Sequence, residues 1–177
     1  AFRIACVREL YEELDVLYGC PATPTTITRS IPFEHALTNG SQQISLRSLV
    51  PFAHWVTPET MPRRFDTHFY IAPDHGYIAK HDGNEAISFQ WVKPREILSE
   101  WEADKVPLMF PTRLNLMKLA RSSTVNAALL AARQAPVVRI LPELSKSGRK
   151  IDLTILKNSG YDVSQATERE LSIESPK

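Results

Sequence analysis

The chain opens with AFRIACVRELYEELDV, residues 1–16, and the expected fold is organised around this stretch. At 100° per residue, Glu9, Glu12 and Glu13 lie within about 100° of one another on a helix. The other side of that helix is apolar and carries Ile4, Val7, Leu10, Tyr11 and Leu14. The pattern predicts an amphipathic helix that packs its apolar side against a core and presents a row of carboxylates.

The clustered glutamates allow two interpretations. Like charges spaced three and four residues apart repel and destabilise an isolated helix. A hard divalent cation such as Mg²⁺ would reverse that penalty, because Mg²⁺ takes oxygen ligands from carboxylates and from substrate phosphates. The alternative is an ordinary acidic helix face in contact with water, which is the commoner situation for charged side chains.

Composition limits the classes of protein that need to be considered. The chain has 177 residues, 43% of them hydrophobic and 23% charged, which suits one globular domain. A net charge of +1 argues against general affinity for nucleic acid or membrane surfaces. Cys6 and Cys20 are too few for a disulfide framework and favour a reducing compartment. No Cys/His spacing indicates a zinc site, and no apolar run is long enough to span a bilayer.

Periodicity and turn residues predict alternating helices and strands beyond the first helix. Strands are expected at 49–56, 65–72, 85–92, 137–141 and 150–156. Helices are expected at 93–103 and 113–134, with weaker helical character within 31–48. The alternation predicts a layered α/β fold with a mixed sheet. We expect a single domain over residues 1–160, an insertion at about 19–48, and a polar C-terminal tail at 161–177, with fraying over 164–177.

The segment Arg8-Glu9-Leu10-Tyr11-Glu12-Glu13 resembles the second half of the Nudix box, Arg-Glu-apolar-x-Glu-Glu-x-Gly-apolar. Asp15 replaces the closing glycine of the box. That position often needs a left-handed backbone, which Asp tolerates better than most residues. The first half of the box is absent because the chain begins at Ala1, so we expect a fragment that lacks the first strands of the fold.

Four further segments strengthen the resemblance because they occur in the family's order. They are WVTPE at 55–59, PRRFDT at 62–67, WVKPRE at 91–96 and FPT at 110–112. Together they are similar to the Nudix subgroup that includes the animal peroxisomal acyl-CoA diphosphatases, over roughly residues 1–135. The resemblance implies an α/β/α sandwich and hydrolysis of a diphosphate linkage with Mg²⁺ or Mn²⁺. It also implies CoA or acyl-CoA as substrate, 3′,5′-ADP and a 4′-phosphopantetheine product, and a peroxisomal or mitochondrial location. Apart from the resemblance, the expected location is the cytoplasm.

The same resemblance implies roles for individual residues. Glu9 and Glu13 are the expected direct metal ligands, and Glu12 binds directly or through water. Arg8 usually holds the first glutamate of the box, although it could simply pair with Glu12 at i,i+4. The general base is either a box glutamate or a loop carboxylate, for which Glu85, with Asp82 near it, is the candidate.

Other polar and aromatic side chains are assigned with their alternatives. Arg63 or Arg64 could clamp phosphate through the guanidinium fork, but neighbouring strand residues face opposite ways, so at most one should reach the site. We expect His68 to be an ordinary strand histidine with a hydrogen bond. Trp55 and Trp91 are expected to pack in the core rather than to stack on a nucleobase.

The expected partner is a small diphosphate compound, either a CoA ester or a nucleotide derivative, with no nucleic acid and no membrane; the oligomeric state is left open. Two alternatives keep part of this interpretation. One is hydrolysis of another nucleoside-diphosphate-linked substrate, because one fold serves many substrates. The other is a catalytically inactive Nudix-like binding module.

Overall fold

The computed structural model describes residues 1–19, 29–38, 44–59, 61, 63–145, 148–150, 158–167 and 169–170. The chain divides into two compact units. The first contains Ala1–Val50 and Ala72–Trp91, and the second contains Pro51–Ile71 and Val92–Lys177. Among the described residues, none of the helices has the length and apolar character needed to cross a bilayer.

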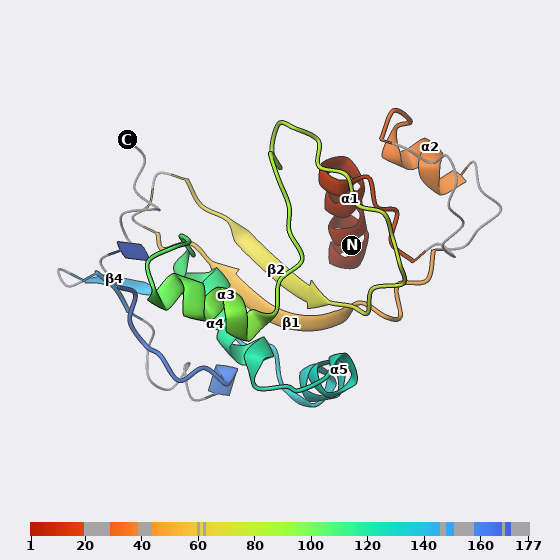
Figure 1. The fold of residues 1–177 in the computed structure, drawn as a ribbon. Helices are drawn as coiled ribbons and strands as arrows, with labels where there is room; N and C mark the ends of the chain where they lie inside the picture. The colour runs from red at the N-terminus through yellow and green to blue at the C-terminus, as the bar shows by residue number, and fades with distance from the viewer. Residues whose placement is uncertain are drawn as a thin grey trace. The chain divides into compact units, whose positions relative to one another are not determined.

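The first unit is built on helix α1, Phe2–Leu14, with the short helix α2, Phe33–Thr38, beside it (Figure 1). Val7 and Tyr11 of α1 are buried, as the apolar side of the helix predicted. The Tyr11 ring lies 5.9 Å from the Phe33 ring, and its hydroxyl donates a hydrogen bond of 2.7 Å to the Ile31 carbonyl. One aromatic side chain therefore anchors α1 to the segment that leads into α2.

Helix α1 ends at Asp15, which adopts the left-handed conformation with φ 61° and ψ 25°. The Asp15 amide donates to the Tyr11 carbonyl, so the cap satisfies a carbonyl of the last turn. This confirms the prediction that Asp15 would take the backbone conformation usually reserved for glycine at this position.

The second unit contains a three-stranded sheet in the order β2-β1-β3. Its strands are β1 (Val50–Val56), β2 (Asp66–Ile71) and β3 (Arg139–Ile140). Strand β3 is parallel to β1, with Arg139 opposite His54, whereas β2 runs antiparallel to β1 (Figure 1). Strands β4 (Glu143–Ser145) and β5 (Gly148–Lys150) form a separate antiparallel pair. The α/β class and the mixed sheet are thereby confirmed, in an arrangement compatible with a Nudix-type fold.

Three helices complete the second unit: α3 (Pro94–Glu102), α4 (Phe110–Ala120) and α5 (Val125–Gln134). Phe110 of α4 packs edge-on against the buried Trp55 ring at 5.8 Å. The Trp55 indole N–H donates to the Tyr161 hydroxyl at 3.4 Å, and that hydroxyl donates to Asn115 Oδ1 at 2.5 Å. Trp55 is therefore a core residue, as expected.

The single helix predicted over 113–134 is wrong, because α4 and α5 are separated at residues 121–124. Ser122, Ser123 and Thr124 occupy the break. Thr124 is extended, with φ −140°, and its hydroxyl accepts a hydrogen bond from the Ala127 amide, which makes it the N-cap of α5. The Leu and Ala periodicity continues through the break, whereas the hydroxyl side chains compete with helical hydrogen bonding.

The strand predicted over 85–92 is also wrong, since these residues form no strand. Ile87 and Trp91 are each 75% exposed, so the expected packing of Trp91 in the core is a further error. Alternating apolar residues form a strand only where a neighbouring strand and a facing layer accept them. The sheet of the described residues, β2-β1-β3, does not include this segment.

The fraying expected from Ser164 onward does not hold for the described part of that segment, because Ala166 and Glu170 are buried. The carboxylate of Glu170 is held by Arg113 of α4, so an ion pair fixes the segment. Cys20, most of the loop at 19–29 and most of the strand expected at 150–156 lie outside the described residues. The single domain at 1–160, the insertion and the tail boundary stay predictions.

Candidate functional site

The three box glutamates project from α1 with different exposure. Glu9 and Glu12 are exposed, whereas Glu13 is half-buried. Arg8 Nη2 lies 2.9 Å from Glu9 Oε1, and Arg8 Nε lies 3.7 Å from Glu12 Oε2. The pairing of Arg8 with Glu12 is the ordinary helix-surface interaction that the sequence allowed as an alternative. Arg8 thus contacts two of the three carboxylates in this structure.

Arg29 fixes the C-terminal end of α1 against the loop at 80–82. Its guanidinium donates to the carbonyls of Glu13, Lys80 and His81 at 3.3, 2.8 and 2.7 Å. Its amide donates to Asp15 Oδ1 at 2.5 Å, and the Lys80 amide donates to the Leu14 carbonyl at 2.9 Å. The backbone that carries Glu13 is therefore tied directly to the loop that leads to Glu85.

Asp82 shapes the loop that presents Glu85. Its carboxylate accepts hydrogen bonds from the amides of Glu85 and Ala86 at 3.0 and 2.8 Å. These backbone hydrogen bonds hold the pKa of Asp82 below its usual range. Gly83, with φ 79°, supplies the left-handed turn that lets the chain fold back onto the Asp82 side chain. Asp82 therefore stays ionised and determines where Glu85 is placed.

The carboxylate of Glu13 experiences the field of this loop. Burial raises the pKa of Glu13 first, and Glu85, Glu9 and Asp82 raise it further, in that order. Like charges must be near one another to act in this way. The charges of Glu85 and Asp82 therefore act on Glu13, although both residues are more than 65 positions away from it in the sequence.

A divalent cation fits this arrangement on chemical grounds. The four carboxylates offer oxygen donors, which Mg²⁺ and Mn²⁺ prefer. Burial is the main cause of the raised Glu13 pKa, and the negative charges of Glu85, Glu9 and Asp82, which a cation would neutralise, add to it. Glu12 is on the same helix but is not among the charges that raise the pKa of Glu13. Glu13 and Glu9 are therefore better candidates for direct metal ligands than Glu12.

Arg63 and Arg64 belong to the second unit and lie before β2 rather than within it. Both side chains are exposed, and Arg64 Nε donates to the Thr57 carbonyl at 3.3 Å. The strand alternation used to separate their directions therefore does not apply to them. Their contact with phosphate stays a prediction.

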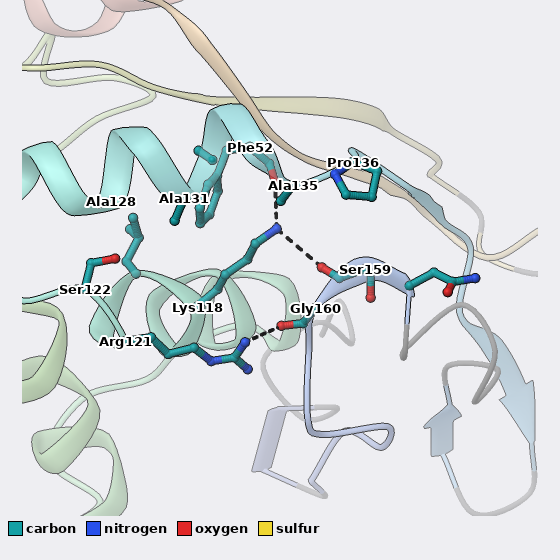
Figure 2. Close-up of a pocket in the computed structure, with 13 residues that line it drawn as sticks. Phe52, Lys118, Arg121, Ser122, Ala128, Ala131, Ala135, Pro136, Ser159 and Gly160 are labelled. Carbon is teal, nitrogen blue, oxygen red and sulfur yellow. Dashed lines mark hydrogen bonds between the residues drawn. The ribbon is translucent and has the colours of Figure 1, made fainter.

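A pocket of about 280 Å³ lies in the second unit, between α4, α5 and residues 158–160 (Figure 2). Lys118 Nζ points into it and donates to the carbonyls of Phe52 and Ser159 at 3.2 and 3.3 Å. Burial and the neighbouring Arg121 lower the pKa of Lys118. Arg121 in turn donates to the Gly160 carbonyl at 2.6 Å. These hydrogen bonds hold residues 158–160 against α4, which is a structural role for both cations.

Arg29 was not singled out from the sequence, and its contacts predict a positioning role. Replacing Arg29 with methionine keeps most of the side-chain length but removes three hydrogen bonds to carbonyls. We expect a loss of about 1–3 kcal/mol in the free energy of unfolding, measured by urea denaturation, because these three carbonyls lose their charged hydrogen-bond donor. Lysine at this position should recover less than half of that loss, since one ammonium cannot reach three carbonyls. Equal stability of wild type and Arg29→Met would contradict this role.

Comparison with known proteins identifies two curated relatives. One is named "Putative nudix hydrolase 7" from Caenorhabditis elegans, 28% identical over 130 residues, covering 68% of this chain and 44% of the relative. The other is the acyl-coenzyme A diphosphatase NUDT19 of Gallus gallus, 25% identical over 162 residues, covering 71% of this chain and 42% of the relative. The chain thus spans less than half the length of each of these relatives.

No family model matches the chain, and no solved structure matches it. One relative is named as a hydrolase and the other as a diphosphatase. Their names support the Nudix hydrolase superfamily for this chain.

Proposed function

We propose that this chain carries the metal-binding helix of a Nudix hydrolase that splits a diphosphate linkage with the help of Mg²⁺ or Mn²⁺. The observation that supports the proposal most directly is the raised pKa of Glu13, which follows first from burial and then from the charges of Glu85, Glu9 and Asp82. If α1 were an ordinary acidic helix in contact with water, there would be no reason for the carboxylates of Asp82 and Glu85 to act on the half-buried Glu13.

Glu13 and Glu9 would hold the cation directly, and Glu12 directly or through water. A cation bound there neutralises phosphate charge and lowers the pKa of the attacking water. The residues of the chain supply the remaining functions. Glu85 lies on a loop whose shape is fixed by Asp82, and it would accept the proton of that water as the general base. Glu9 and Glu12 remain the alternative bases within the box.

Arg8, and Arg63 or Arg64 before β2, would interact with negatively charged groups of the site and of the substrate. Arg8 lies close to Glu9 and Glu12, so it can orient them and partly offset their repulsion. Arg63 or Arg64 would bind the phosphate oxygens, since a guanidinium can donate two parallel hydrogen bonds to them. Both side chains are exposed and therefore accessible to a substrate.

CoA or acyl-CoA is the substrate that we propose, with 3′,5′-ADP and a 4′-phosphopantetheine compound as products. The support is the name of the chicken relative, an acyl-coenzyme A diphosphatase, together with the segments at 55–59, 62–67, 91–96 and 110–112. A peroxisomal or mitochondrial location belongs to the same proposal. Another nucleoside-diphosphate-linked compound is the second enzymatic candidate.

An inactive binding module is the candidate from a different class. It is favoured by the contacts of Arg8, which pairs with Glu9 and Glu12 as it would on an ordinary acidic helix. Such a module would bind a diphosphate compound without splitting it. The experiment below separates it from the enzyme.

The test is incubation of the protein with CoA, an acyl-CoA and a panel of nucleotide sugars and dinucleotides, with products identified by mass spectrometry. We expect hydrolysis in the presence of Mg²⁺ or Mn²⁺ at a concentration on the order of millimolar. Excess EDTA should stop hydrolysis, and restoring the ion should recover it. Hydrolysis that persists without divalent ions would contradict the mechanism. Binding of a panel compound with no product under any condition would favour the binding module.

A further inference from the structure

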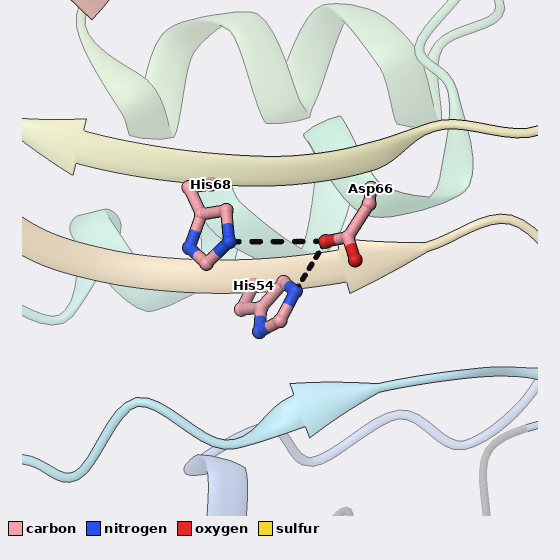
Figure 3. A group of neighbouring side chains, drawn as sticks. All are labelled: His54, Asp66 and His68. Atoms are coloured by element: carbon pink, nitrogen blue, oxygen red, sulfur yellow. Dashed lines mark hydrogen bonds and ion pairs between the residues drawn. The ribbon is translucent and has the colours of Figure 1, made fainter. Parts of the chain in front are cut away.

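Three side chains with nitrogen and oxygen donors meet on strands β1 and β2, away from the glutamate helix in the sequence. His54 lies on β1, and Asp66 and His68 lie on β2 (Figure 3). His54 Nε2 lies 2.5 Å from Asp66 Oδ1, and His68 Nε2 lies 3.8 Å from the same oxygen. One donor atom from each residue falls within 4.8 Å of the other two.

The strand pairing produces this arrangement. The Thr57 amide donates to the Phe65 carbonyl at 2.9 Å where β1 and β2 meet at their connection. Counting three residues back from Thr57 and three forward from Phe65 places His54 opposite His68 in the antiparallel pair. Their rings stack at 4.0 Å with an angle of 19° between planes, as expected for directly opposed side chains. Asp66 is two residues before His68, so it lies on the same face of β2.

Both imidazoles direct Nε2 toward one point, which Asp66 Oδ1 now occupies (Figure 3). Two imidazole nitrogens and one carboxylate form a donor set that suits zinc and similar transition metals, with room for water as a further ligand. Donor atoms that share one tetrahedral zinc lie about 3.3 Å apart. The 2.5 Å separation must therefore open and the 3.8 Å separation must close, each by less than 1 Å.

The Asp66 side chain can make that adjustment. It is 60% exposed, whereas His54 and His68 are 15% and 25% exposed and are fixed by the strands and by their stacking. Moving Oδ1 away from His54 and toward His68 changes both separations in the required direction. The positive charge of Arg139, which lies opposite His54 on β3, acts on Asp66, and the Arg139 side chain is exposed.

We infer that His54, Asp66 and His68 form a second metal site, which binds a divalent transition metal such as Zn²⁺ and links β2, at the edge of the described sheet, to β1. Its donor set differs from the carboxylate oxygens proposed as Mg²⁺ ligands on α1, Glu9 and Glu13, so the two sites should select different ions. The inference does not rest on hydrolytic activity and can be tested without any substrate.

The test uses the metal-free protein and two probe ions. Titration with Co²⁺, followed by its visible absorption, should give one saturable site, and Zn²⁺ should displace the signal. Binding should weaken in each of the variants Asp66→Asn, His54→Ala and His68→Ala. The loss of affinity should exceed the roughly 10- to 100-fold that is typical when a residue hydrogen-bonded to a metal ligand is replaced. His35→Ala is the matched control, because His35 is an exposed histidine on α2, and this variant should bind as the wild type does.

A stability measurement guards against variants that do not fold. Zn²⁺ should raise the melting temperature of the wild type and of His35→Ala, but not that of Asp66→Asn, whose exposed side chain can change without loss of core packing. Unchanged Co²⁺ binding in Asp66→Asn and His68→Ala, or no saturable Co²⁺ signal in the wild type, would overturn the inference. Loss of Mg²⁺-dependent hydrolysis in Glu13 variants with Co²⁺ binding intact would leave it standing, so failure of one proposal is distinct from failure of the other.

Discussion

Replacing Glu13 with glutamine is expected to abolish hydrolysis while the protein melts at the same temperature as the wild type or higher. The amide has nearly the shape of the carboxyl group but cannot bind a hard cation with a full charge. We expect kcat/KM to fall by at least about 100-fold, which corresponds to roughly 2.7 kcal/mol of transition-state stabilisation. Stability should not fall, because burial disfavours the ionised Glu13 in the folded protein and Glu85, Glu9 and Asp82 repel it.

The sign of the stability change follows from the raised pKa of Glu13. Between its ordinary pKa and the raised value, the folded protein binds more protons at Glu13 than the unfolded chain does, so stability falls as pH rises through that interval. At neutral pH the wild type therefore carries the full penalty and Glu13→Gln carries none. The advantage of the variant should disappear in thermal melts below the ordinary carboxyl pKa.

Glu100→Gln is the matched control for both measurements. Glu100 is an exposed helical glutamate on α3, and its replacement should change neither kcat/KM nor the melting temperature. An unchanged rate in Glu13→Gln would remove Glu13 from the metal site. A marked loss of stability in the same variant would show that the carboxylate has a favourable partner rather than the repulsive neighbours described above.

Glu85 links this prediction to the pH dependence of metal binding. A carboxylate must be ionised to bind a cation, so the affinity for Mn²⁺ should weaken on acidification at a higher pH than an ordinary glutamate would give. Glu85→Gln removes the strongest of the repelling charges and lowers the pKa of Glu13. In Glu85→Gln, the pH at which the affinity for Mn²⁺ weakens on acidification should therefore be lower than in the wild type. Calorimetric titrations across a pH series would measure this shift.

The features predicted correctly from the sequence are those that short stretches determine. The amphipathic pattern in 1–16 gave the buried Val7 and Tyr11, and the motif gave the left-handed Asp15. Strands β1 and β2 and helix α3 follow from local alternation and from Pro94 at the first position of its helix. The role of Glu85 as a loop base was proposed from the family resemblance rather than from any local pattern, and it stays a prediction.

The features that escaped prediction depend on contacts between distant residues. Arg29 matters through carbonyls at 80 and 81, which no sequence period connects to it. His54 faces His68 across two strands, so a search for closely spaced zinc ligands found neither. Asp66 and His68, spaced by two on a predicted strand, were the available signal. The segment 85–92 failed for the opposite reason, because a strand needs a neighbour that local alternation cannot reveal.

Replacing one residue of the Arg113–Glu170 pair is expected to lower the stability of the protein more than any other single substitution proposed here. Arg113 Nε and Nη2 lie 2.6 and 3.0 Å from the two carboxylate oxygens of Glu170, and the two side chains are 6% and 0% exposed. The Thr167 amide and hydroxyl also donate to Glu170, at 2.8 and 2.9 Å. The carboxylate is therefore fully hydrogen-bonded, and the Arg113 guanidinium lies 4.6 Å from the centre of the Trp101 ring.

Glu170→Ala should destabilise the protein by about 3–5 kcal/mol, because it leaves the Arg113 guanidinium buried without a counter-charge. In a chain of this size the melting temperature should fall by roughly 6–20 °C. The double variant Arg113→Met with Glu170→Leu should lose much less than Glu170→Ala alone, since it buries no charge. Asp162→Asn removes the exposed ion pair with Arg121 and should cost no more than about 1 kcal/mol. If Glu170→Ala and Asp162→Asn had equal effects in calorimetric melts, the segment at 166–170 would not be fixed to α4 by a buried charge, and the packing of Ala166 would have to hold it instead.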